Sequence, residues 1–168
     1  RTSLRVRLQV VRRFRHLLCD QAELVAHAAN SNQHRPVSEV LASEIIPLAD
    51  ACRFLEREAG KTLATRRLGW RGRSLWLSGV KSEIHREPFG LVLVIAPSNY
   101  PIFLPGVQVL QALVAGNAVL LKPGPAGLRA ALQLARLLRA AGLPENLLRV
   151  LDESPEADGV CGPSVCAG

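Results

Sequence analysis

Residues 87–125 read EPFGLVLVIAPSNYPIFLPGVQVLQALVAGNAVLLKPGP, and this stretch decides the fold. It contains six unbroken apolar residues, Leu91–Ala96, a run that is rich in branched side chains and too short for a helix. Such a run is typical of a strand that is buried on both faces. A turn rich in proline and polar residues follows, and helical spacing then extends from about residue 102 to residue 115.

A second strand is predicted directly after this helix. Gly116 and Asn117 predict the helix end, because glycine readily adopts the left-handed conformation found there. The apolar run 118–121 predicts the strand, and strand, helix and strand in this order predict a right-handed parallel crossover. Asn99 and Lys122 come just after the carboxyl ends of the two strands. In open α/β sheets that edge is where ligands bind.

The same residues resemble the cofactor domain of aldehyde dehydrogenases, which are NAD(P)-dependent oxidoreductases. The family pattern is roughly P-x-G-V-x-x-x-I-x-P-W-N-[YF]-P, followed by A-x-x-A-G-N-x-V-V-x-K-P-S-E. The matching residues are, in order, Pro88, Gly90, Pro97, Asn99, Tyr100, Pro101, Ala115, Gly116, Asn117, Lys122 and Pro123. So many matches are specific for the family, although they do not indicate which aldehyde is used.

The resemblance implies roles for individual residues. Asn99 corresponds to the asparagine whose side-chain amide contributes to the oxyanion hole, and Lys122 to the lysine that contacts the adenosine ribose of NAD or NADP. The implied cofactor-binding residues are Ile95, Ala96, Pro97, Ser98, Lys122 and Gly124. Taken without the resemblance, Asn99 is a turn former and Lys122 a solvated lysine at a strand end.

Two departures from the family pattern stand next to these residues. Ser98 occupies the place of the family's tryptophan, so an apolar wall is missing. Pro125 occupies the place of a glutamate that would hold ribose hydroxyls, and it has no side-chain acceptor. The choice between NAD and NADP therefore stays open.

The predicted fold class is α/β, with N-terminal helices, a β-hairpin arm and a partial Rossmann-like parallel sheet. The expected parts are an N-terminal helical region (1–67), a hairpin or oligomerisation arm (68–88), a partial NAD(P)-binding region (89–152) and an irregular tail (153–168). Periodicity predicts one amphipathic helix over residues 2–30 and a second over about 38–64, kinked or split at Pro47.

Two further elements are expected after Gly124. A helix over residues 128–141 should bury one face, and residues 147–151 should form a third strand. The predicted buried positions of that helix are Leu128, Ala131, Leu132, Ala135 and Leu138.

The arm is predicted from two short runs, 74–77 and 81–86, the second of which alternates in character. In the family the strands at this position pack against a partner subunit. Trp70 and Trp76 add apolar surface that favours this role over a plain surface hairpin.

Composition narrows the classes of function. The net charge is +7, but the arginines are spread along helical faces and only 4% of residues are aromatic, so we expect solvated surface and no nucleic-acid partner. No apolar run is long enough to span a membrane and no signal peptide is recognisable, which predicts a cytoplasmic protein. Cys19 and Cys52 are expected to be buried, and the Cys161–Cys166 spacing does not predict a metal site.

Two hypotheses about function follow. The family oxidises an aldehyde to a carboxylic acid through a thiohemiacetal, which needs a nucleophile in a G-Q-x-C context and a general base in E-L-G-G. Neither occurs in these residues. We therefore expect an N-terminal fragment of an NAD(P)-dependent aldehyde dehydrogenase that is inactive alone, binds cofactor weakly and belongs to a homo-oligomer. The alternative is a self-associating structural or interaction module without catalysis, since 48% of the residues are hydrophobic.

Overall fold

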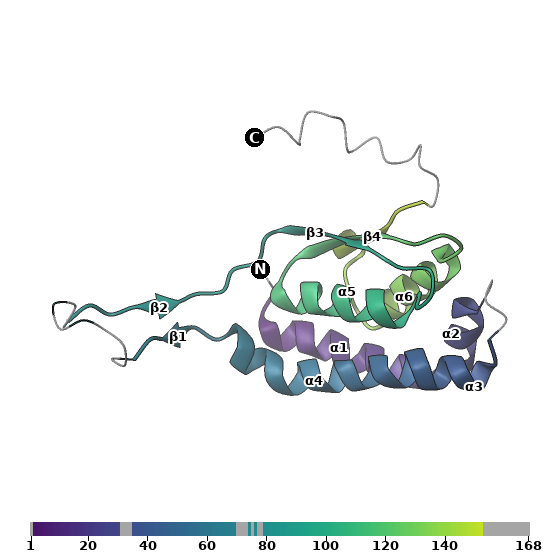
Figure 1. Cartoon of the computed structure of the whole chain (residues 1–168), viewed down its shortest axis with the longest axis horizontal. Helices are drawn as coiled ribbons and strands as arrows, with labels where there is room; N and C mark the ends of the chain where they lie inside the picture. Colours follow the sequence, from purple (N-terminus) through teal and green to yellow (C-terminus); the bar gives the residue numbers. More distant parts are fainter. Residues whose placement is uncertain (1, 31–34, 70–73, 75, 77–78, 153–168) are drawn as a thin grey trace, which may run out of the picture.

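The computed structural model describes residues 2–30, 35–69, 74, 76 and 79–152 (Figure 1). Their elements form three layers, with a parallel sheet, then two helices, then the long N-terminal helices. The predicted tail, 153–168, lies outside the described residues, and so do Trp70, Cys161 and Cys166.

The N-terminal region is helical, as predicted, but its first helix is interrupted. The elements are α1 (Leu4–Asp20), α2 (Ala22–Ala29), α3 (Val37–Val40), a π-helical turn (Leu41–Ile45) and α4 (Ile46–Leu63). The single helix expected over 2–30 is wrong, because Gln21 adopts φ −112° and ψ 24° and separates α1 from α2. The break allows α1 to pack on α4 while α2 packs on α6.

Pro47 does not split the second predicted helix. The chain instead widens into the π-helical turn immediately before it, and α4 continues from Ile46. A proline nitrogen has no hydrogen to donate, and π-helical segments, although rare, occur mostly as single turns within α-helices. The wider turn includes Glu44 and Ile45, which are both buried.

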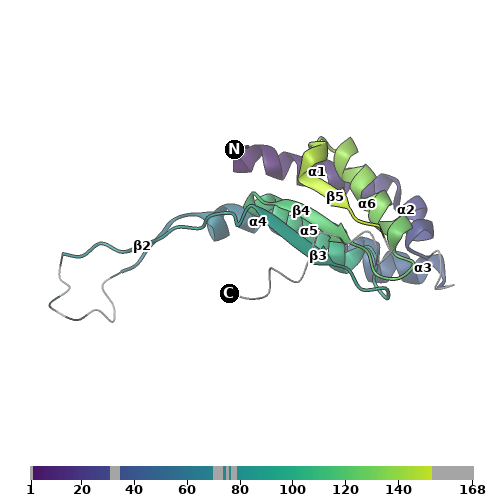
Figure 2. The same cartoon turned by 90° about the horizontal axis from the view of Figure 1, so that it is seen from above.

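The arm projects away from the body of the molecule (Figures 1 and 2). Its strands are β1 (Arg66–Arg67) and β2 (Glu83–Ile84), which pair antiparallel. The prediction of a first strand at 74–77 is wrong for the described Ser74 and Trp76, neither of which is in a strand. Pairing occurs closer to the base of the arm, where Arg67 also forms an ion pair with Glu83.

The sheet and its helices agree with the prediction. They comprise β3 (Leu91–Ile95), α5 (Phe103–Ala115), β4 (Ala118–Lys122), α6 (Leu128–Ala140), a short 3-10 helix η3 (Glu145–Leu147) and β5 (Leu148–Val150). The strands are parallel in the order β3-β4-β5. Gly116 ends α5 with φ 98°, the left-handed conformation expected there.

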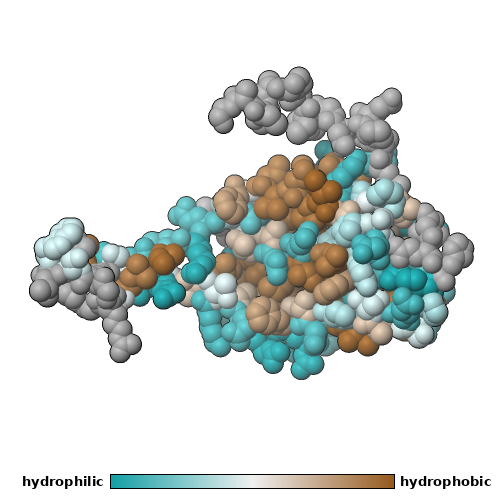
Figure 3. All heavy atoms as spheres, in the orientation of Figure 1, coloured by the Kyte–Doolittle hydropathy of each residue, from teal (hydrophilic) through white to brown (hydrophobic). Residues whose placement is uncertain are grey.

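Only one face of β3 is buried, so the prediction of burial on both faces is wrong. Val94 is 4% exposed, whereas Leu91, Leu93 and Ile95 are 59%, 55% and 70% exposed. The reason is that α5 and α6 lie on the same side of the sheet (Figure 1). The exposed side chains form the apolar area over β3 at the top of the body in Figure 3. We call Leu91, Leu93 and Ile95 the β3 apolar strip.

Two smaller predictions of burial are also wrong. Leu132 on α6 is 50% exposed, because the helix turns the face that contains Leu134 toward the core. Cys19 is exposed near the end of α1, whereas Cys52 on α4 is fully buried as expected.

Candidate functional site

The carboxyl ends of β3 and β4 lie side by side and are joined by a backbone hydrogen bond. Ile95 is the register partner of Lys122, and the Ala96 N–H donates to the Lys122 carbonyl at 2.8 Å. The turns that follow the two strands therefore start from the same edge, which we call the rim. Ligands of parallel α/β sheets bind at this edge.

Gly124 brings the turn after β4 into contact with the turn after β3. A Cβ atom built on Gly124 would lie 2.7 Å from the Ala96 carbonyl oxygen, 2.9 Å from the Pro97 carbonyl carbon and 2.9 Å from the Ser98 nitrogen. Only a glycine permits so close an approach of two backbones. Of the six residues predicted to bind the cofactor, the structure thus brings Ala96, Pro97, Ser98 and Gly124 together directly.

Ile95 and Lys122 complete this group on the uncovered face of the sheet. Because they are register partners on parallel strands, their side chains point to the same face. The Ile95 side chain is 70% exposed, and the Lys122 Nζ donates to the Asp152 carbonyl oxygen at 2.8 Å, which ties the end of β4 to the residues after β5. The ammonium group of Lys122 is therefore held beside an apolar surface.

Asn99 lies in the turn between β3 and α5 and is exposed. The neighbouring Pro101 and Ile102 are buried, so the turn is embedded on the side that leads into α5. A side-chain amide in this position can donate hydrogen bonds to a ligand at the rim.

A buried glutamate, which sequence reasoning missed, holds the start of α5. Glu44 is 0% exposed, and its Oε2 accepts hydrogen bonds from the N–H groups of Ile102 at 2.8 Å and Phe103 at 3.2 Å. Its Oε1 accepts from Nη2 of Arg35. One signal could have found it: α5 begins without a serine, threonine, aspartate or asparagine at its N-cap, so its first amides need acceptors from elsewhere.

The carboxylate of Glu44 also occupies two amides of α5 that could otherwise bind an anion. Helix N-termini often bind phosphate through free amides and the helix dipole. At α5 the amides of Ile102 and Phe103 already donate to the Glu44 carboxylate, so they are not free to bind a phosphate. Asn99 and Lys122 add side-chain donors to the rim, and the Lys122 ammonium also donates to the Asp152 carbonyl.

Asn117 has the structural role that its position after Gly116 predicts. It is 5% exposed, its Nδ2 donates to the Ala112 carbonyl at 3.1 Å, and its Oδ1 accepts from the Gly90 N–H at 3.0 Å. A single side chain therefore closes the end of α5 and fixes the start of β3.

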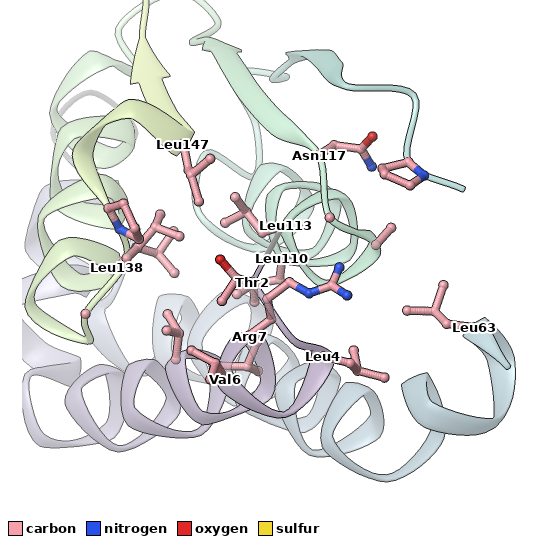
Figure 4. A pocket seen from close by; sticks show the side chains of 18 of the residues that line it. Thr2, Leu4, Val6, Arg7, Leu63, Leu110, Leu113, Asn117, Leu138 and Leu147 are labelled. Atoms are coloured by element: carbon pink, nitrogen blue, oxygen red, sulfur yellow. The ribbon is translucent and has the colours of Figure 1, made fainter. Parts of the chain in front are cut away.

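A cavity of about 540 Å³ lies at the other edge of the sheet, where the strands begin. Its walls come from α1, the end of α4, α5 and the segment between α6 and β5, and Figure 4 shows Arg7 among apolar side chains such as Leu110 and Leu138. Arg7 Nη1 donates to the Val114 carbonyl at 2.6 Å near the end of α5, and burial lowers the pKa of its guanidinium. None of the predicted site residues lines this cavity.

Two kinds of feature are absent from the described residues. In that part of the chain no helix combines the length and the apolar character that crossing a membrane requires. Nor do the same residues bring together three or more histidine, cysteine or acidic side chains that could hold a metal ion.

A family model and individual relatives place this chain among the same group of dehydrogenases. Residues 1–160 match the model of the aldehyde dehydrogenase family. The 3,6-anhydro-alpha-L-galactose dehydrogenase of Streptomyces coelicolor is 34% identical over 158 residues, which are 90% of this chain and 29% of that protein. The N-succinylglutamate 5-semialdehyde dehydrogenase of Acinetobacter baylyi is 30% identical over 158 residues, which are 92% of this chain and 30% of that protein.

A solved structure has the same fold. The NADP-dependent glyceraldehyde-3-phosphate dehydrogenase of Bacillus halodurans, crystallised with NADP, superposes with a TM-score of 0.80 at 27% sequence identity. The match covers 92% of this chain and 32% of that one. The chain thus spans about a third of the length of the proteins it matches.

Proposed function

This chain belongs to the aldehyde dehydrogenase family, and we propose that it forms the N-terminal helices, the arm and the first part of the cofactor sheet of an NAD(P)-dependent enzyme that oxidises an aldehyde to a carboxylic acid. These three parts correspond to the predicted ranges 1–67, 68–88 and 89–152, except that the arm begins slightly earlier, since β1 lies at Arg66–Arg67. The observation that supports the proposal best is the rim, where Gly124 packs against Ala96–Ser98, the residues that precede Asn99, and where Lys122 is the register partner of Ile95.

At this rim Asn99 would serve as the oxyanion donor. When a thiolate adds to an aldehyde, negative charge develops on the aldehyde oxygen, and a fixed N–H donor stabilises it. The Asn99 carboxamide is exposed on a turn whose two ends are hydrogen-bonded, at Ala96 and at Ile102. The thiolate and the general base would come from parts of the complete enzyme that lie beyond these 168 residues.

The cofactor would bind along the uncovered face at the rim. The Lys122 ammonium would donate to ribose hydroxyl oxygens, and Ile95 would offer an apolar surface beside it. Ala96, Pro97, Ser98 and Gly124 would form the base of the site, with the half-buried Pro97 and the exposed Ser98 nearest to the ligand. Bound NAD+ or NADP+ would supply the hydride acceptor. Pro125 places no carboxylate where a 2′-phosphate would sit, so both cofactors are compatible with these residues.

We further propose that the complete enzyme is a cytoplasmic homo-oligomer with a small-molecule aldehyde as substrate. The arm would contact a partner subunit, and its exposed apolar side chains support this role. Trp76 is 81% exposed, Val80 50% and Ile84 38%.

An exchange experiment tests the catalytic part of the proposal. The corresponding residues of the Streptomyces coelicolor relative, which is 34% identical, are replaced by this chain, and reduction of the cofactor is followed by absorbance with that relative's own substrate. We expect turnover, and Asn99→Ala should lower kcat by about 10²–10³-fold. Gln111→Ala, which removes an exposed carboxamide from the middle of α5, is the control and should leave kcat unchanged. Unchanged kcat in Asn99→Ala would refute the assigned role. The 168-residue chain alone should show no aldehyde-dependent reduction.

A second candidate function is self-association without catalysis, and the β3 apolar strip favours it. β3 is the terminal strand of the described sheet, and its outer edge and its exposed apolar face could pair with a second copy of the chain. Light scattering of the 168-residue chain should then give a dimer at high micromolar concentration. A monomer under these conditions would count against this candidate.

A further inference from the structure

We infer that Glu44 and Arg35 are positioning residues that fix the turn bearing Asn99, and that the N-terminal helical region thereby shapes the oxyanion site. This inference rests on the proposed function of Asn99. Its basis is a pair of charged side chains from the segment before α4 that reach the loop between β3 and α5. Glu44 and Ile102 are 58 residues apart in the sequence.

Glu44 secures the end of the turn. Its side chain is completely buried, and one carboxylate oxygen accepts from two consecutive amides, those of Ile102 at 2.8 Å and Phe103 at 3.2 Å. The first amides of a helix have no acceptor within the helix, so α5 depends on this external cap. The negative charge also interacts favourably with the positive end of the helix dipole.

Arg35 connects this cap to the turn itself. Its Nη2 donates to Glu44 Oε1, and its guanidinium carbon lies 5.7 Å from the centre of the Tyr100 ring, the residue next to Asn99. At that distance a guanidinium attracts an aromatic face. Asn30 holds Arg35 in place, since its Oδ1 accepts from the Arg35 N–H at 2.8 Å and its Nδ2 donates to the Arg35 carbonyl at 2.5 Å.

The other end of the turn is secured by the sheet. The Ala96 N–H donates to the Lys122 carbonyl at 2.8 Å, and Gly124 packs against Ala96–Ser98. Asn99 therefore lies between two fixed ends, one held by β4 and the other by Glu44. Catalytic donors are effective only when neighbouring groups hold them close to the productive geometry, and here the second fixed end comes from the N-terminal region.

The test uses NMR of the 168-residue chain and two variants of the cap. In Glu44→Gln the carboxamide oxygen still accepts from the two amides, whereas Glu44→Met keeps the length of the side chain but has no acceptor. We expect the Ile102 and Phe103 amide protons to exchange at least about tenfold faster in Glu44→Met, with Glu44→Gln intermediate. The Asn99 side-chain amide signals should shift in the same order.

Matched controls come from the second arginine–glutamate pair of the N-terminal helices. Glu56 accepts from Arg15 Nε at 2.8 Å on the surface shared by α1 and α4. Glu56→Gln and Glu56→Met make the same changes in charge and side-chain chemistry as the two Glu44 variants. They should leave the Asn99 signals unchanged. Asn99 signals that stay in place in Glu44→Met, or that move equally in Glu56→Met, would overturn the inference.

A substitution of Arg35 provides a second test of the inference if Glu44→Met does not fold. Arg35→Lys retains the positive charge but has one nitrogen in place of the planar fork, so it cannot keep the contact with Glu44 and the stacking on Tyr100 together. We expect backbone relaxation at Ser98–Tyr100 to report increased motion, and unchanged relaxation would contradict the inference. These readouts need neither cofactor nor aldehyde. Failure of the proposed function would appear in the exchange experiment with the relative, and failure of positioning would appear in the NMR measurements.

Discussion

Gly124 and Ala96 approach so closely that a methyl group on Gly124 would lie 2.7 Å from the Ala96 carbonyl oxygen. The contact is between two backbones, so a side chain cannot rotate away to relieve it. We predict that Gly124→Ala lowers the free energy of unfolding by about 1–3 kcal/mol, because one turn must move. Urea denaturation measures the loss, and amide shifts at Ala96 and Ser98 should report the displacement.

Gly60→Ala is the matched control for this substitution. Gly60 lies inside α4, and a Cβ built on it would meet nothing within 4 Å. Because alanine favours the helix more than glycine does, we expect a gain of up to about 1 kcal/mol. If the two substitutions have the same effect on the urea midpoint, the close approach at the rim does not constrain the fold.

The two asparagines of the α/β unit should respond differently to removal. Asn117→Ala deletes the acceptor of the part-buried Gly90 N–H and the buried donor to Ala112, and should cost about 2–3 kcal/mol of stability. Asn99→Ala removes an exposed side chain and should change stability by less than about 0.5 kcal/mol. Thermal and urea unfolding of both variants test the contrast, which equal losses would contradict.

Lys122 should contribute to cofactor affinity through its ammonium group. Lys122→Met keeps an apolar stem but removes the donor, and we predict that the Kd for NADP+ rises about tenfold. The measurement is an NMR titration that follows the amides of Ile95 and Ser98. Lys61→Met makes the same change in net charge on α4, where Lys61 pairs with Glu58, and should leave the Kd unaltered. Equal effects would indicate a general attraction of the phosphates to a basic protein.

Cys52 should be chemically inert at neutral pH. Burial, and to a smaller extent the nearby Glu56, raises the pKa of its thiol from 9.0 to about 12. In a background with Cys161→Ser and Cys166→Ser, we expect a thiol reagent at pH 8 to modify exposed Cys19 at least about a hundredfold faster than Cys52. Mass spectrometry of the labelled peptides gives both rates, and similar rates would mean that Cys52 is accessible.

The raised pKa of the Cys52 thiol also predicts how the stability of the fold depends on pH. The thiolate forms more readily in the unfolded chain than in the folded one. The stabilisation of the folded state by the neutral Cys52 thiol is therefore complete below pH 9.0 and is lost as the pH rises toward 12. Cys52→Ala should therefore flatten the decline in stability over that range of pH. An unchanged decline in urea midpoints would contradict this account.

Self-association should depend on the β3 apolar strip. Leu93 is 55% exposed at the centre of β3, and Leu93→Lys places a charge where a second copy would pack. We predict that the substitution shifts the 168-residue chain to monomer in light scattering. Leu132→Lys, on α6 and 50% exposed, is the control and should leave the oligomeric state unchanged.

Much of the fold could be predicted because its signals are local. The apolar runs at 91–96 and 118–121 predict strands that the structure contains, and Gly116 predicts the end of α5, because a strand or a helix end is encoded by neighbouring residues. The break at Gln21 could not be predicted in this way. No proline or glycine lies at this break. The break allows α2 to pack on α6, a helix that is far from α2 in the sequence.

The candidate site also combines features that local sequence predicts with features that only the tertiary structure shows. The sequence by itself determined that Asn99 and Lys122 follow neighbouring parallel strands, since strand order and turn chemistry are properties of short segments. Only the tertiary structure decided that Glu44 caps α5, that Gly124 packs against Ala96, and that Leu91, Leu93 and Ile95 face outward. The physical reason is that burial and the choice of a hydrogen-bond partner depend on which segments meet in space, and many side chains could satisfy the same amide.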